Sequence, residues 1–99
     1  MNYSFHPEAE LEFLEAIAYL DDCDEDLGLD FSRQVYRVIR LLTQFPNLGT
    51  PIEDRFRRCL IERFRYGLIY EIIDDEIVIQ VVMHTSRDPE YWKTRVYPD

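Results

Sequence analysis

The sequence contains little lysine, glycine or cysteine, and each shortage excludes a class of site. Lys93 is the only lysine among eleven basic residues, and the 99 residues include three glycines and two cysteines. No glycine-rich stretch has the form of a phosphate-binding loop, and His and Cys do not cluster at metal-ligand spacing. We therefore expect no cofactor and no bound metal.

Long apolar runs and targeting signals are also missing. No run approaches the roughly 20 apolar residues that a membrane span requires. The N-terminus, MNYSFHPEAELEF, lacks the basic start and apolar region of a signal peptide. The chain is therefore expected in the cytoplasm, without membrane contact, where Cys23 and Cys59 stay reduced by default.

Basic residues are absent from the first third of the chain. Residues 1–30 carry ten Asp or Glu and no Lys or Arg, residues 31–99 carry ten acids and eleven bases, and the net charge is −9. This charge argues against a general nucleic-acid binder, which depends on cationic contacts to phosphate, and we expect no direct sequence-specific DNA binding. Five arginines between Arg55 and Arg65 still predict a local basic surface.

The chain is long enough for one core, so we expect a single domain over residues 1–99. Its first half has helical periodicity. A helix beginning at Pro7 carries an apolar stripe of Ala9, Phe13, Ala16, Ile17 and Leu20, widened by Leu11, Leu14 and Ala18.

A second helix is expected after Gly28, with Asp30 as its N-cap and Pro46 ending it. Two helices joined by a short turn form an antiparallel hairpin. Acids dominate the first helix, so the arginines of the second predict that the two complement each other. The second apolar stripe is Phe31, Val35, Val38, Leu42 and Phe45, with Arg33, Arg37 and Arg40 outside it.

Three β segments follow a Pro/Gly loop at 46–51, and Asp74-Asp75 is a natural hairpin turn between the last two. A short extended segment at residues 3–5 precedes the first helix, and a short helix begins at Asp88-Pro89. The predicted class is α+β: an N-terminal antiparallel helical hairpin packed on a small antiparallel β-sheet, with a short C-terminal helix. The three strands are expected at roughly Arg57–Arg63, Tyr66–Ile73 and Glu76–His84.

Pairing about the turn predicts two different faces of the sheet. One is apolar and should receive the helices, and the other is mixed. Small monomers seldom expose partly apolar faces of this kind. Two interpretations remain: the last helix covers the mixed face with Tyr91 and Trp92, or a partner binds there. The apolar face pairs Ile72 with Ile77, Tyr70 with Ile79 and Leu68 with Val81, while the mixed face pairs Glu71 with Val78, Ile69 with Gln80, Gly67 with Val82 and Arg65 with His84.

The segment HTSRDPEYWKTR, residues 84–95, contains one histidine among arginines. A histidine beside arginines has the groups needed for acid–base chemistry on a phosphate. If the chain is a nuclease, its catalytic candidates are Arg65, His84 and Arg87. The competing interpretation is a solvated histidine at a strand end, because one histidine near arginine is a weak signal.

The whole chain resembles the RelE/ParE superfamily of bacterial toxin–antitoxin toxins, and is closer to the ParE branch. The resemblance rests on FHPEAELEFLEAIAYL with the following GLDF, on FPNLGTPIEDRFRRCLIERFRYGLIYEI, and on VVMHTSRDPEYWKTR. It implies a helical hairpin on a small antiparallel sheet. It also implies a toxin of a type II, plasmid-stabilising system, neutralised by the C-terminal amphipathic segment of an antitoxin.

Targets differ within that superfamily. The ParE branch implies action on DNA gyrase without a hydrolytic site, whereas RelE-like members cleave mRNA on the ribosome. An inactive scaffold that only binds an antitoxin is a third interpretation. For partner binding the candidates are Arg58, Arg63, Arg65, Ile69, Val78, Val82, His84, Arg87, Tyr91 and Arg95.

Overall fold

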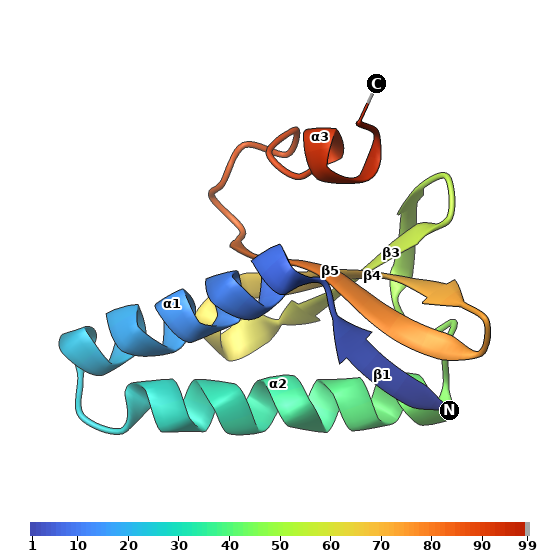
Figure 1. Ribbon diagram of the computed structural model, residues 1–99. Coiled ribbons are helices and arrows are strands. Elements are labelled where there is room, and N and C mark those ends of the chain that lie inside the picture. Colours follow the sequence, from blue (N-terminus) through green and yellow to red (C-terminus); the bar gives the residue numbers. More distant parts are fainter. Residues whose placement is uncertain (99) are drawn as a thin grey trace.

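The computed structural model describes residues 1–98, so Asp99, at the end of the predicted domain, lies outside the described residues. A helical hairpin lies against one face of a five-stranded sheet, and the C-terminal segment crosses the other face (Figure 1). The elements are β1 (Asn2–Phe5), α1 (Pro7–Cys23), α2 (Leu27–Gln44), β2 (Thr50–Glu53), β3 (Phe56–Ile61), the 3-10 turn η1 (Glu62–Phe64), β4 (Tyr66–Ile73), β5 (Glu76–His84) and α3 (Lys93–Val96).

The α+β class and the hairpin-on-sheet arrangement are confirmed. The sheet has the order β1-β5-β4-β3-β2 and is mixed, because β1 pairs with β5 in parallel. Two edge strands were missing from the sequence-based prediction: the extended N-terminus is strand β1, and β2 begins inside the predicted loop. Among residues 1–98, no helix is long and apolar enough to cross a membrane.

α1 begins where its sequence predicts. His6 is the N-cap, and its Nδ1 accepts a hydrogen bond of 3.0 Å from the backbone N–H of Glu8. The stripe of Ala9, Phe13, Ala16 and Leu20 is buried. The predicted widening of this stripe is wrong: Leu11 and Leu14 are 57% and 56% exposed, because α2 and the sheet together cover only one side of α1.

α2 begins four residues earlier than predicted, at Leu27, because its N-cap is Asp26 and not Asp30, and Gly28 lies inside the helix. A Cβ at Gly28 would stand 2.5 Å from the carbonyl oxygen of Ile17. Glycine is therefore required there because the two helices approach closely. The buried positions are Phe31, Val35, Ile39 and Leu42, whereas Phe45, predicted to be buried, is 59% exposed.

The predicted charge complementarity within the hairpin is not realised. Among residues 1–98, no acid of α1 forms an ion pair with an arginine of α2. The two helices instead meet through apolar groups, including an edge-to-face contact of Phe13 with Tyr36. Glu10 and Glu15 of α1 and the three arginines of α2 are exposed to solvent.

A β-bulge divides the β4–β5 hairpin in two. Between the Asp74-Asp75 turn and Tyr70 the pairs are as predicted, including Ile72 with Ile77 and Tyr70 with Ile79. The register then shifts by one residue, leaving Gln80 without a partner, so that Ile69 pairs with Val81 and Tyr66 with His84. Because side chains alternate between faces, the shift exchanges the faces of all later β5 residues. Four predicted pairs are therefore wrong: Leu68 with Val81, Ile69 with Gln80, Gly67 with Val82, and Arg65 with His84.

Candidate partner-binding groove and C-terminal clamp

The sheet face opposite the helices has an apolar floor built by three strands. In register across β3, β4 and β5, Arg58 lies beside Ile69, and Ile69 beside Val81; one step further, Leu60 lies beside Gly67, and Gly67 beside Met83. The predicted mixed face thus exists, but the bulge changes which β5 residues lie on it. Val82, predicted on this face, is instead buried in the core on the helical side of the sheet.

The C-terminal segment covers part of this floor. Trp92 is 3% exposed and packs with Phe56, Ile69 and Val81 in a second, smaller apolar cluster. Its ring meets Phe56 edge-to-face at a centroid distance of 5.1 Å. The covering role predicted for Trp92 is therefore confirmed. The remainder of the face is not covered by the described chain.

Two adjoining hollows occupy the uncovered part. One has a volume of about 160 Å³ and the other of about 150 Å³, and both are lined by Arg58, Ile69, Met83 and Pro89. We call them together the sheet groove. Arg87, Leu60 and Gly67 line the first hollow. The groove therefore has an apolar floor of aliphatic side chains, with arginines along its length.

The arginines of the sheet groove have no acidic partner. Arg58 and Arg87 are exposed, and neither forms an ion pair with any acid of residues 1–98. Arg87 lies over the ring of Tyr91 at 4.2 Å from its centroid. The nearby acids Glu53 and Glu90 are both bound by Lys93, at 2.8 and 2.9 Å. The groove thus presents positive charge beside apolar surface in a protein whose net charge is −9.

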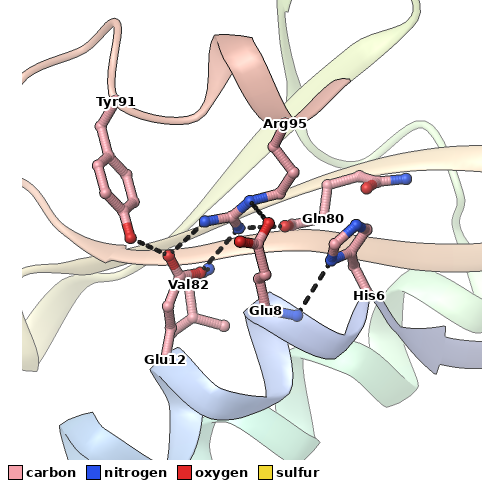
Figure 2. Close-up of polar contacts among 7 residues, drawn as sticks. All are labelled: His6, Glu8, Glu12, Gln80, Val82, Tyr91 and Arg95. Atoms are coloured by element: carbon pink, nitrogen blue, oxygen red, sulfur yellow. Dashed lines mark hydrogen bonds and ion pairs between the residues drawn. The ribbon is translucent and has the colours of Figure 1, made fainter. Parts of the chain in front are cut away.

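The C-terminal segment is held in place by Glu12 of α1 (Figure 2). Arg95 donates to both oxygens of Glu12, at 3.0 and 2.7 Å, and the hydroxyl of Tyr91 donates to Oε2 at 2.6 Å. Arg95 also donates to the carbonyl of Gln80 at 2.7 Å. Its Nε lies 2.9 Å from Glu8 without hydrogen-bond geometry, so that contact is an ion pair alone. We call Glu12, Tyr91 and Arg95 the C-terminal clamp.

The clamp also completes the sheet edge. β1 pairs with β5 only from Glu76 to Ile79, so no strand covers the N–H of Val82. Glu12 Oε1 accepts that N–H at 3.0 Å. The carboxylate thereby satisfies a backbone donor that would otherwise be unpaired, and one side chain ties together α1, β5 and the C-terminal segment.

The electrostatics of the clamp follow from burial and hydrogen bonding. The side chains of Glu12 and Arg95 are 11% and 8% exposed. Burial raises the pKa of Glu12, but hydrogen bonds from Arg95, Tyr91 and Val82 outweigh it, and the net pKa lies below its ordinary value of 4.5. The hydrogen bond to Glu12 in turn raises the pKa of Tyr91.

Acid is therefore expected to weaken the clamp. Because the folded-state pKa of Glu12 is lowered, its contribution to the free energy of unfolding is complete above about pH 4.5 and is lost as the pH falls through the folded-state value. Chemical unfolding measured between pH 3 and pH 7 should show this loss, and Glu12→Gln should show a smaller one. If the free energy of unfolding falls equally with pH in the two proteins, groups other than Glu12 cause the acid sensitivity.

The structure does not bring all three predicted catalytic residues into one hollow. His84 faces α1, where Tyr66, Tyr19 and Arg87 line the same hollow of about 180 Å³. Its Nδ1 lies 2.8 Å from the hydroxyl of Ser86. Arg65 adopts a left-handed conformation with φ 58° and lines a different hollow with Leu60 and Thr85. The predicted placement of Arg65 beside His84 is therefore wrong, and only His84 and Arg87 share a site.

The remaining partner-binding candidates are scattered. Arg63 lies on the helical side, 3.9 Å from Asp30 of α2. Val78 pairs with Glu71 between the bulge and the Asp74-Asp75 turn, and it does not line the sheet groove. Of the ten candidates, Arg58, Ile69 and Arg87 line the groove, Arg65 lies near its end beside Leu60, and Tyr91 and Arg95 belong to the clamp.

Sequence reasoning missed Glu12, Leu60 and Met83, and it placed Gly67 on the mixed face without naming it as a partner-binding candidate. Glu12 sits among the other acids of α1, and no local pattern marks it, because its partner Arg95 lies 83 residues away. Met83 was assigned to neither face, since the bulge decides which one it occupies. Among residues 1–98, His, Cys, Asp and Glu side chains form no group of three that would suit a metal ion.

Comparison with known proteins now identifies the family. The family described as "ParE toxin of type II toxin-antitoxin system, parDE" matches residues 3–89. The chain belongs to the ParE toxin family. The match includes α1, α2, strands β2 to β5, all of β1 except Asn2, and the residues of the sheet groove up to Pro89. In this ParE-family chain, Tyr91 and Arg95 of the clamp lie beyond the matched region.

Two curated relatives carry the same family name. Each is called Toxin ParE2, one from Mycobacterium tuberculosis strain CDC 1551 / Oshkosh and the other from strain ATCC 25618 / H37Rv. Both are 28% identical to this chain over 85 residues, which is 85% of this chain and 81% of the relative. The resemblance to the ParE branch that the sequence indicated is confirmed.

Proposed function

We propose that this ParE-family toxin is neutralised by an antitoxin segment that occupies the sheet groove, and that the free toxin inhibits DNA gyrase in the cytoplasm. The segment would be acidic and partly apolar, as expected for the amphipathic C-terminal part of an antitoxin. The gyrase assignment rests on the membership of the ParE family, and it is supported by the finding that Arg65 and His84 line different hollows.

The unpaired arginines of the sheet groove are the observation that supports this partner. Arg58 and Arg87 flank the floor formed by Leu60, Ile69 and Met83. A segment alternating apolar and acidic side chains would bury the floor and pair both arginines through charge-assisted hydrogen bonds. Opposite charge on the two partners would also speed their encounter.

A two-arm assay tests the target. The purified chain is added to a gyrase supercoiling reaction and, separately, to a translating extract whose transcripts are followed. We expect inhibition of supercoiling that the antitoxin reverses, and intact transcripts. The antitoxin to use is the product of a short neighbouring reading frame with a DNA-binding N-terminal half and an amphipathic tail.

The same assay can contradict the proposal in two ways. Supercoiling that stays unaffected at saturating toxin would remove gyrase as the target. Cleaved transcripts would instead point to a ribosome-dependent nuclease, and His84→Ala and Arg87→Ala should then abolish the cleavage, because these two residues share a hollow.

A further inference from the structure

The outer side of the helical hairpin, which faces away from the sheet, carries two complementary stripes. On α1, Leu11, Leu14 and Ala18 are exposed along one line, and the exposed acids Glu10 and Glu15 flank them. This spacing of three and four residues places them on one helix face, opposite the buried stripe. Leu11 and Leu14 are each more than half exposed, which is unusual for adjacent leucines of a small protein.

α2 carries the opposite charge on its outer side. Arg33, Arg37 and Arg40 are exposed at spacings of four and three, and among residues 1–98 none of them forms an ion pair. Leu29 and Tyr36 are exposed beside them, at 46% and 37%. The hairpin thus presents an apolar, acidic helix next to an apolar, basic helix. We call this surface the hairpin outer face.

We propose that the hairpin outer face binds a second copy of this chain, with α1 of each protomer packed antiparallel on α2 of its partner. In such a dimer the acids of α1 in each protomer would lie against the arginines of α2 in its partner, so the two-fold symmetry repeats the same contact. The occupant is a second copy because the chain itself supplies the complement of each stripe.

Only one two-fold axis satisfies this charge pattern. An axis running between the two hairpins and parallel to their helices places α1 over α2 of the partner. An axis perpendicular to the helices would place α1 over α1, bringing acids against acids. Figure 1 shows α1 and α2 running alongside each other, so an axis parallel to both is available.

That axis also fixes the register. Rotation about a line parallel to the helices keeps each residue at its own height along them. Within one chain Phe13 stands beside Tyr36, with ring centroids 5.6 Å apart. Counting outward from this pair in opposite directions along the two helices brings Glu10 level with Ile39 and Glu15 level with Gln34, each one residue from Arg40 and Arg33 respectively. The acids on α1 of one protomer therefore fall beside arginines on α2 of the other.

The size of the face predicts a weak dimer. Helices of 17 and 18 residues are each about 26 Å long, and a pair of them is about 20 Å wide, so the face offers on the order of 500 Å² per protomer. The total is at the small end of specific interfaces, and we expect a dissociation constant in the micromolar range. Because the pairs are partly exposed, salt should weaken the association.

Sedimentation velocity from about 1 to 300 µM tests the proposal, in reducing buffer because Cys23 is exposed. The wild-type chain should shift from monomer to dimer at low salt. Arg33→Glu/Arg40→Glu should weaken dimerisation at least tenfold, and so should Glu10→Lys/Glu15→Lys. Arg58→Glu, on the opposite side of the molecule, is the matched control and should dimerise like wild type.

The chain carrying all four reversals gives the sharpest result. It should regain self-association, because its basic α1 faces an acidic α2, and it should not mix with wild-type chains labelled for fluorescence transfer. Circular dichroism of each variant checks that the fold is retained. A wild-type chain that stays monomeric at 300 µM and low salt overturns the proposal, as does a fourfold-reversed chain that dimerises no better than either twofold variant.

Discussion

Replacing Glu12 by leucine is expected to lower the free energy of unfolding by about 3 kcal/mol, the range found when one partner of a buried ion pair is removed. The loss arises because Arg95, only 8% exposed, keeps its charge without its main acceptor. The N–H of Val82 also loses its partner. Urea unfolding at pH 7 measures the change.

A double replacement separates the charge from the packing. Glu12→Leu/Arg95→Leu should recover a large part of the lost stability, because apolar residues of similar volume often replace a buried ion pair at little cost. Glu15→Leu, an exposed neighbour on the same helix, is the control and should change the free energy of unfolding by less than about 0.5 kcal/mol. A Glu12→Leu protein as stable as this control would show that the clamp does not stabilise the fold.

Reversing the charge of Arg58 is expected to weaken binding of the antitoxin by about 2 kcal/mol, a factor of roughly 30. Arg58 lines both hollows of the sheet groove and has no acidic partner within residues 1–98. An acidic segment in the groove would meet a like charge in Arg58→Glu. Calorimetric titration of the variant with the purified antitoxin measures the difference.

Two further variants show whether the groove itself is responsible. Arg63→Glu makes the same charge change on the helical side, near Asp30, and should alter the affinity by only a few-fold. Gly67→Leu keeps every charge but fills the floor, since a Cβ there has only ordinary contacts, 3.5 Å from Leu60 and 3.7 Å from Arg58. It should weaken binding as Arg58→Glu does. Equal losses for Arg58→Glu and Arg63→Glu would place the antitoxin elsewhere.

The strands show how far alternation alone can be trusted. β4 and β5 lie at the residues that the sequence predicts, and the Asp74-Asp75 turn pairs Ile72 with Ile77. On the side of Tyr70 away from this turn, the predicted register was wrong by one residue, because Gln80 forms a bulge. Its side chain donates a hydrogen bond to the buried carboxylate of Glu71. A single inserted residue reverses the faces of everything beyond it, and no period-two pattern reveals where the insertion falls.

For the helices, too, the sequence predicted one part of the structure and packing decided the other. Their existence and most of their buried positions follow from periodicity, but the break between them lies at residues 24–26 and not at Gly28, where it was predicted. How wide each stripe becomes depends on the neighbours that pack against it, which is why Leu11, Leu14 and Phe45 proved exposed.

By itself, the sequence determined the fold class, the two long strands and the resemblance to ParE-like toxins. These depend on patterns that repeat within a few residues, which local backbone geometry enforces. The tertiary structure alone decided which residues meet at the sites. Glu12 finds Arg95 across 83 residues, and Arg58 and Met83 reach one groove from different strands. Such contacts depend on strand order and on the bulge, which are settled only when the whole chain packs together.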